Sequence, residues 1–295
     1  MSIKFDYLIA PLFVLIWSTG FVIARLAMPY AEPATFLFWR CLGVLAAMAA
    51  FSMVWKIHWP NWQQIKHIAI AGSMLQFGYL WGVWFAVKLG MTAGLVAIIV
   101  GLQPILTAWF AAWISEKVSA RQWIGLIFGF SGVALVVVEK IGFTYIPLVS
   151  YVLAVGALLS ITFGTLYQKK YCAVFDLRAG SCIQFGITAV LCFICMNLFE
   201  TGEMTWNLPV IGAMFWAVFP LSIGSISLLY IMIRKGAATK VTSLLYLTPP
   251  TTAAMAWLLF NEPFTLYMAL GLGLTMTGVV LVNSKQSNSV ATMAE

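Results

Sequence analysis

Apolar residues run along this chain in long blocks, and short polar segments separate the blocks. A helix that crosses a bilayer needs about 20 mainly apolar residues. Ten blocks approach or exceed this length, and no separator is long enough to hold a soluble domain. The pattern therefore predicts ten transmembrane helices, over residues 7–28, 34–55, 68–88, 91–114, 121–138, 146–167, 178–199, 208–233, 237–260 and 264–283.

The composition agrees with lipid as the main solvent. Hydrophobic residues make up 62% of the chain and charged residues only 8%, against about one quarter charged in an ordinary soluble domain. The net charge of +7 comes from basic residues scattered between apolar blocks without forming a stripe. We therefore expect an all-α integral membrane protein with the lipid bilayer as partner and no nucleic-acid partner.

Lysine and arginine in the connecting segments predict the orientation, because cytoplasmic loops carry an excess of them. With the N-terminus in the cytoplasm, the outer segments hold only Arg25, Lys88 and Lys140. The inner segments then hold Lys4, Lys56, Lys66, Lys117, Arg121, Lys169, Lys170, Arg178, Arg234, Lys235, Lys240 and Lys285. Both termini are therefore expected in the cytoplasm.

The two halves of the chain resemble each other. The segment Gly78–Val136 aligns on Gly224–Val282 without a gap, and glycines, a proline and a glutamate match in order. The matched pairs include Gly78/Gly224, Gly90/Gly236, Pro104/Pro250, Glu116/Glu262, Gly125/Gly271, Gly132/Gly278 and Val133/Val279. Five spans per half is an odd number, so the second half must cross the membrane in the opposite sense. The sequence thus predicts two inverted five-helix repeats, an arrangement found in many transporters.

Several motifs follow one another in the order typical of a known family. They are "WSTGFVIARLA" from Trp17, "FWR" from Phe38, "LQP" from Leu102, "SEK" from Ser115 and "GLIFGFSGVALV" from Gly125, with the second-half copies "LTPP", "NEP" and "GLGLTMTGVVLV". In this the chain resembles the drug/metabolite transporter superfamily and, within it, the EamA family, which includes exporters of aromatic amino acids and other metabolites. The span that opens the second half departs from the pattern, because it lacks a tryptophan near its centre.

The resemblance implies a 5+5 fold with a central cavity and no bound cofactor. It implies export or uptake of small organic metabolites such as amino acids across the bacterial inner (plasma) membrane. Because the sequence contains no ATP-binding motif, we expect a secondary transporter, and we favour an exporter. We expect a first repeat over 1–145, a second over 146–283 and a polar tail over 284–295. A channel and a lipid-modifying membrane enzyme remain as alternatives, although no catalytic constellation or metal-ligand cluster stands out in the sequence.

Polar residues inside the spans are the candidates for a substrate site, because lipid makes them costly unless they face protein or water. Arg40 lies about 10 Å into the second span at 1.5 Å per residue. It is a candidate for binding a carboxylate or forming a gate; alternatively it snorkels to the outer interface or pairs with Glu32.

The other candidates lie mainly on the third, fourth, eighth and ninth spans, which the repeat relates in pairs. These four spans are expected to line one mixed cavity for a polar, weakly charged ligand with an apolar part. The predicted substrate-binding set is Trp17, Arg40, Gln76, Tyr79, Trp84, Gln103, Ser222, Tyr230 and Tyr246. For each residue the alternative is polar contact between helices.

Prolines mark expected kinks. Pro104 removes a backbone donor and should free the carbonyl of Val100, and such breaks survive in lipid only beside protein or a cavity. The predicted hinge positions are Pro104, Pro220, Pro249 and Pro250. Glu116 and Glu262 are expected to lie at helix N-termini on opposite membrane faces, where negative charge is favourable.

Overall fold

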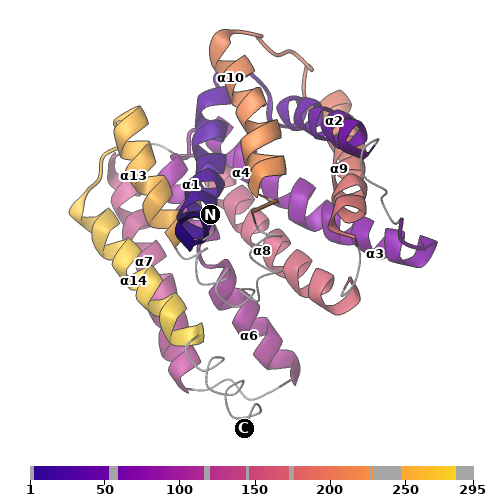
Figure 1. Ribbon diagram of the computed structural model, residues 1–295. Helices are drawn as coiled ribbons and strands as arrows, with labels where there is room; N and C mark the ends of the chain where they lie inside the picture. Colours follow the sequence, from indigo (N-terminus) through magenta and orange to yellow (C-terminus); the bar gives the residue numbers. More distant parts are fainter. Residues whose placement is uncertain are drawn as a thin grey trace.

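The computed structural model describes residues 3–52, 59–115, 120–143, 146–172, 176–225, 227–228 and 247–283, almost all of them helical (Figure 1). The one pairing of extended backbone in these ranges is a bridge between Ala31 and Met204. The elements are α1 (Ile3–Ala27), α2 (Pro33–Ser52), α3 (Trp62–Gly72), η1 (Ser73–Gly78), α4 (Tyr79–Lys88), α5 (Ala93–Val100), α6 (Gln103–Ser115), α7 (Ala120–Phe143), α8 (Leu148–Tyr171), α9 (Leu177–Phe199), α10 (Leu208–Trp216), η2 (Ala217–Gly224), α13 (Thr248–Phe260) and α14 (Leu266–Asn283).

Five helical stretches are long and apolar enough to cross a membrane by length and composition. They are Ile9–Ala27, Pro33–Ala50, Trp62–Lys88, Leu148–Tyr171 and Arg178–Phe199. Shorter apolar helices cover Ala93–Thr107, Trp123–Val136, Leu208–Gly224 and Leu266–Leu281. The prediction of an all-helical membrane protein is therefore confirmed.

Two short π-helices occupy equivalent places in the two repeats. The first, η1, ends at Gly78, and the second, η2, ends at Gly224, the pair that the sequence repeat aligns. Pro220 lies inside η2 and has no amide hydrogen to donate, whereas η1 contains no proline. A widened turn at the same point of both halves is notable because π-helices are rare and concentrate at functional sites.

At the predicted kink near Pro104, a turn of two residues, Gly101 and Leu102, separates two helices. The first helix, α5, ends at Val100, and α6 begins at Gln103. Pro104 lies in the first turn of α6, where its missing amide hydrogen leaves no bond unmade. Pro249 and Pro250 likewise lie in the first turn of α13; the carbonyls that they were expected to free, on Leu245 and Tyr246, fall outside the described residues.

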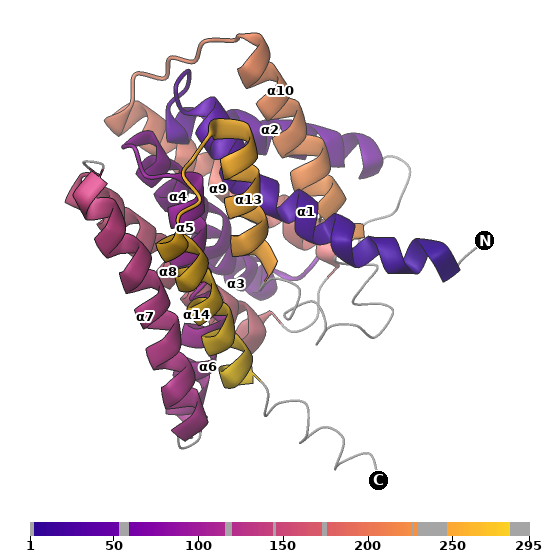
Figure 2. The ribbon, with the colours of Figure 1, turned by 90° about the vertical axis from the view of Figure 1, so that its left-hand side faces the viewer.

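The last helices of the two repeats, α7 and α14, pack closely side by side (Figures 1 and 2). A β-carbon on Gly132 would lie 2.5 Å from the carbonyl oxygen of Gly271, and one on Gly278 would meet the carbonyl oxygen of Gly125. The helices are antiparallel, because the residue with the higher number on α7 contacts the residue with the lower number on α14. The repeat pairs Gly125 with Gly271 and Gly132 with Gly278, so the two contacts are reciprocal. Reciprocal, antiparallel contacts between equivalent helices are what an inverted repeat requires.

Two loops from different repeats close one end of the bundle, and we call residues 30–32 and 200–205 together the loop clasp. The Glu200 carboxylate accepts hydrogen bonds from the backbone amides of Ala34 and Thr35, each 2.8 Å long, at the start of α2. In return Glu32 accepts from the amides of Thr201 at 2.8 Å and Gly202 at 3.1 Å. The helix N-terminus and the carboxylate stabilise each other, so the clasp joins the two repeats.

Glu262 also stabilises a helix, but not the one that the sequence predicted. We expected it to begin the helix that follows it, whereas its carboxylate accepts from the amides of Ala93 at 3.2 Å and Gly94 at 3.4 Å, at the start of α5. The side chain is only 8% exposed. The left-handed conformation of Asn261, with φ of 51°, ends α13 and turns the chain toward α5. The repeat-equivalent Glu116 lies outside the described residues.

Candidate functional site

A cavity of about 250 Å³ lies inside the helix bundle. Roughly 10–15 Å³ is enough for one water molecule, so the space admits a small organic molecule. Its walls come from both repeats: α1, α2, the α3–η1–α4 span, α8, α9 and η2. The lining residues are Trp17, Gly20, Phe21, Arg40, Leu75, Gln76, Tyr79, Leu80, Val83, Trp84, Ile161, Gln168, Ser181, Gln184, Phe185, Leu221 and Ser222.

Arg40 is the one charged residue among the described residues of this wall. Its side chain is 5% exposed, and Nε and Nη2 donate to the Ser222 hydroxyl at 3.2 and 2.9 Å. Ser222 in turn donates to the carbonyl of Ala217 at 2.7 Å, across the wide turn of η2. The remaining guanidinium nitrogen, Nη1, is buried without a hydrogen-bond partner. The arginine of the first repeat is thus anchored on the π-helix of the second.

Neither structural alternative for Arg40 holds. A snorkelling arginine would reach water, whereas this one is buried. The alternative of a pair with Glu32 does not hold either, because the Glu32 carboxylate accepts from Thr201 and Gly202 in the loop clasp. The depth of Arg40 in its span, estimated from the sequence, was compatible with either alternative. The guanidinium stays at the cavity because it donates to the Ser222 hydroxyl on η2, which is far away in sequence.

Aromatic rings line the same cavity as Arg40. Trp84 is 1% exposed, and its ring packs on Phe36 with centroids 4.7 Å apart. Trp17 packs on Phe13 with centroids 5.5 Å apart. The third predicted aromatic residue on this wall, Tyr79, is buried on α4. The rings give the site the apolar surface that suits a ligand with an apolar body.

Amides line the part of the cavity nearest the ends of α8 and α9. Gln184 Nε2 donates to Gln168 Oε1 at 2.9 Å, and Gln76 and Ser181 complete this polar part. The sequence analysis missed Gln168, Ser181 and Gln184, because we expected the third, fourth, eighth and ninth spans to form the walls. Isolated polar residues near the ends of two apolar spans were the available signal.

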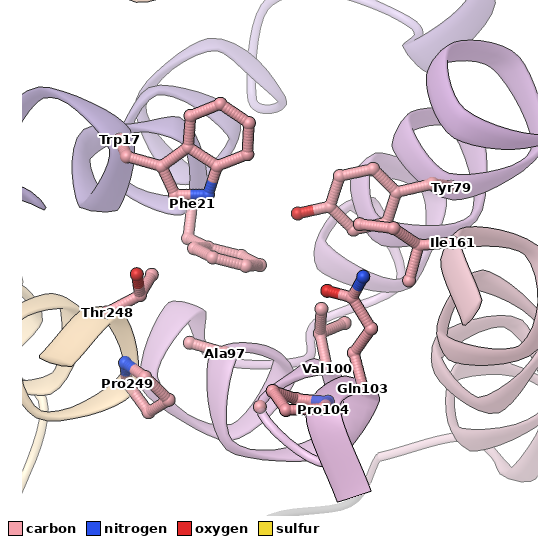
Figure 3. A pocket seen from close by; sticks show the side chains of 11 residues that line it. Trp17, Phe21, Tyr79, Ala97, Val100, Gln103, Pro104, Ile161, Thr248 and Pro249 are labelled. Carbon is pink, nitrogen blue, oxygen red and sulfur yellow. The ribbon is translucent and has the colours of Figure 1, made fainter. Parts of the chain in front are cut away.

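A second, smaller cavity of about 40 Å³ adjoins the first and shares Trp17, Phe21, Tyr79 and Ile161 with it (Figure 3). Figure 3 shows the Tyr79 hydroxyl and the Gln103 amide facing this space, with Thr248 and Pro249 on the far wall. The described residues of the fourth and ninth predicted spans therefore include some that line this small cavity, and none of them lines the one with Arg40. Gln103 lines it while donating to the Thr165 hydroxyl at 3.1 Å.

The structure brings six of the nine predicted substrate-site residues to the large cavity: Trp17, Arg40, Gln76, Tyr79, Trp84 and Ser222. Gln103 lies at the small one. Tyr230 and Tyr246 lie outside the described residues. Of the two histidines, His67 lies at the interface of α3 and α8, with Nδ1 2.8 Å from the Tyr167 hydroxyl, and His58 is outside the described residues. No group of histidine, cysteine and acidic residues within the described ranges could hold a metal ion.

A cavity between two helical repeats, in a chain with several helices long and apolar enough to cross a membrane, is the architecture expected of a membrane transporter. The EamA-like transporter family model matches residues 4–138 and again residues 148–284, and the chain belongs to this family. The family match confirms the resemblance seen in the motifs and the presence of two EamA repeats.

Known relatives are named as transporters. A Bacillus subtilis protein named "Uncharacterized transporter YvbV" is 29% identical over 92% of this chain and 89% of its own length. A Salmonella typhimurium protein named "Probable amino-acid metabolite efflux pump" is 22% identical over 94% of this chain and 92% of its own length. A solved crystal structure has the same fold, with a TM-score of 0.67 at 18% identity over 96% of this chain and 98% of that chain.

Proposed function

We propose that this protein is a secondary exporter of small organic metabolites such as amino acids, and that the cavity at Arg40 holds the substrate. It acts without ATP, in a bacterial inner membrane, with both termini in the cytoplasm and ten spans arranged as two inverted five-helix repeats. The observation that carries the proposal is a buried guanidinium with a free donor at the wall of an internal cavity.

The energetics of Arg40 support a binding role. A buried charge costs several kcal/mol unless it is paired, and a charged group inside a membrane span is by default a functional-site candidate. A neutral serine hydroxyl offsets part of that cost but supplies no opposite charge. A carboxylate on the substrate would supply both the charge and an acceptor for Nη1.

The position of the cavity supports alternating access. Toward the loop clasp the cavity ends at Trp84, which packs on Phe36. At its other end lie Gln168, near the end of α8, and Ser181, near the start of α9. By the predicted orientation this is the cytoplasmic side. Exchange of conformations between the repeats would open the clasp end and close the amide-lined end.

Transport in proteoliposomes tests the proposal. Purified protein is reconstituted with internal unlabelled amino acids and related carboxylates, and exchange with external labelled compounds is measured for the wild type, Arg40→Met and Arg25→Met. The expected result is exchange of at least one compound by the wild type and Arg25→Met, and its loss in Arg40→Met. Equal exchange by the wild type and both variants would show that Arg40 is not part of the substrate site.

A further inference from the structure

The electrostatics of the cavity at Arg40 narrow the chemical class of its ligand. Resting on the proposed function, we infer that the preferred substrate is an organic monocarboxylate with an apolar body and no ammonium group, so that it carries a net charge of −1. An amino acid zwitterion is the poorer ligand of the two.

The first observation is a positive charge without a counter-ion. Among the residues that the structure describes, Arg40 is the only charged one lining the large cavity, and its hydrogen-bond partner there is the neutral Ser222 hydroxyl. A net anion cancels this charge when it binds, whereas a zwitterion leaves the cavity with the same net charge as before. Because buried charges are weakly screened, the difference in net charge dominates over the shared carboxylate contact.

The second observation is that the acidic side chains with described surroundings lie away from the cavity. Glu203 is exposed and does not line it, and the other four have partners elsewhere. Glu32 and Glu200 accept backbone amides in the loop clasp, Glu262 accepts those at the start of α5, and Asp176 pairs with Arg178 at 2.9 Å. The segment 229–246, which the structure does not describe, contains no aspartate or glutamate. The part of the cavity wall that the structure shows therefore offers an ammonium group no carboxylate.

The geometry of an α-amino acid makes this mismatch unavoidable. Its ammonium group is one carbon away from the carboxylate, so pairing the carboxylate with Arg40 holds two positive charges within the 4–6 Å or so over which charges perturb each other strongly. The two tryptophan rings on this wall are partly covered against a cation, because Trp84 packs on Phe36 and Trp17 on Phe13.

The rest of the wall fits the remainder of such a ligand. Phe21, Leu80 and Ile161, together with the aromatic rings, surround an apolar body. The amide groups of Gln76, Gln168 and Gln184 lie on the same cavity and suit a neutral polar substituent, such as a hydroxyl or keto group, better than a second charge.

Three compounds that share a phenyl ring on a two-carbon unit separate the possibilities: 3-phenylpropanoate carries the carboxylate alone, phenylalanine carries both charged groups, and 2-phenylethylamine carries the ammonium alone. Their affinities are measured by calorimetry on full-length protein in nanodiscs. We expect 3-phenylpropanoate to bind about tenfold or more tightly than phenylalanine, and 2-phenylethylamine to show no binding. Arg40→Met should lower the affinity for 3-phenylpropanoate by about tenfold to a hundredfold. Arg40→Lys should lower this affinity less, and Arg25→Met should leave it unchanged.

The outcomes distinguish this inference from the proposed function. Phenylalanine binding as tightly as 3-phenylpropanoate, or more so, would overturn the inference, and so would the absence of binding by all three compounds. In both cases the proposed function still stands if the exchange assay shows Arg40-dependent transport of another metabolite. Undiminished 3-phenylpropanoate binding in an Arg40→Met protein with wild-type thermal stability would overturn both.

Discussion

Gly132 and Gly271 meet backbone to backbone: a β-carbon added to Gly132 would lie 2.5 Å from the carbonyl oxygen of Gly271 and 2.8 Å from the amide nitrogen of Thr275. Backbone atoms at that distance cannot yield as a flexible side chain can. The contact therefore fixes the separation of α7 and α14, and close approach through small residues is how membrane helices associate.

Substitution at this contact should destabilise the protein. We expect Gly132→Ala to lower the free energy of unfolding by about 1–3 kcal/mol, the usual cost of overpacking, and Gly278→Ala to do the same, because it makes the reciprocal contact. Thermal unfolding in detergent measures both. Gly273→Ala is the matched control on α14, since a β-carbon there meets nothing within 4 Å; equal Tm values for Gly273→Ala and Gly132→Ala would contradict the account.

Much of the fold could be predicted from the sequence because the repeat was visible in it. Gly125, Gly132, Gly271 and Gly278 stood out as matched pairs, and the structure uses all four at one helix contact. The π-helix η1 could not be predicted, since "SMLQFG" has no proline and no other local signal for a widened turn. The break before Pro104 was anticipated as a kink, because a proline shows where a helix is interrupted but not how far the chain turns.

The site was predicted less completely, for a physical reason. Periodicity shows that Gln76 and Tyr79 share a helix face, but it does not show which helix that face meets. The hydrogen-bond partner of Arg40 is Ser222, which lies 182 positions away in the sequence. The amide of Ala93, which donates to Glu262, lies 169 positions away from that glutamate. Such tertiary contacts depend on how the repeats pack, which a single sequence does not reveal.

Ser222 should tune substrate affinity through Arg40. Ser222→Ala removes the acceptor for Nε and Nη2, and a hydrogen bond to a charged group contributes about 1.5–3 kcal/mol. Without this anchor the guanidinium no longer holds its place on the cavity wall, so part of that energy is lost from substrate binding, and we expect the KM of transport to rise about tenfold. Ser227→Ala is the control, because Ser227 is exposed and donates only to the carbonyl of Ile223 in its own helix. An unchanged KM in Ser222→Ala would show that the anchor is dispensable.

Glu262 should stabilise the start of α5. In Glu262→Ala the buried amides of Ala93 and Gly94 lose their side-chain acceptor, and an unsatisfied buried group costs about 1–3 kcal/mol. We expect the Tm of Glu262→Ala to be several degrees lower than that of the wild type. The Tm of Glu262→Gln should lie between the two, because glutamine keeps one acceptor oxygen. Glu203→Ala, at an exposed position, should leave the Tm unchanged. No loss of stability in Glu262→Ala would exclude the capping role.

The loop clasp should control access from its end of the bundle. Glu200→Ala removes the acceptor for the amides of Ala34 and Thr35, which should favour conformations open at that end. A cysteine replacing the fully buried Leu37 should then react faster with an impermeant thiol reagent added from the clasp side. Labelling that is no faster than in a Glu203→Ala background would count against the clasp as a gate.

The most direct measurement of the central claim, that the cavity at Arg40 holds the transported substrate, is substrate protection of a single cysteine at Gln184. This position lines the cavity, and the five native cysteines are first replaced by serine or alanine. The account predicts that a transported carboxylate slows alkylation of Gln184→Cys, with half-protection at the concentration that half-saturates transport, and does not slow alkylation of Ser227→Cys. The contradicting result is an alkylation rate of Gln184→Cys that does not change at a substrate concentration that saturates transport. That result would place the substrate outside this cavity.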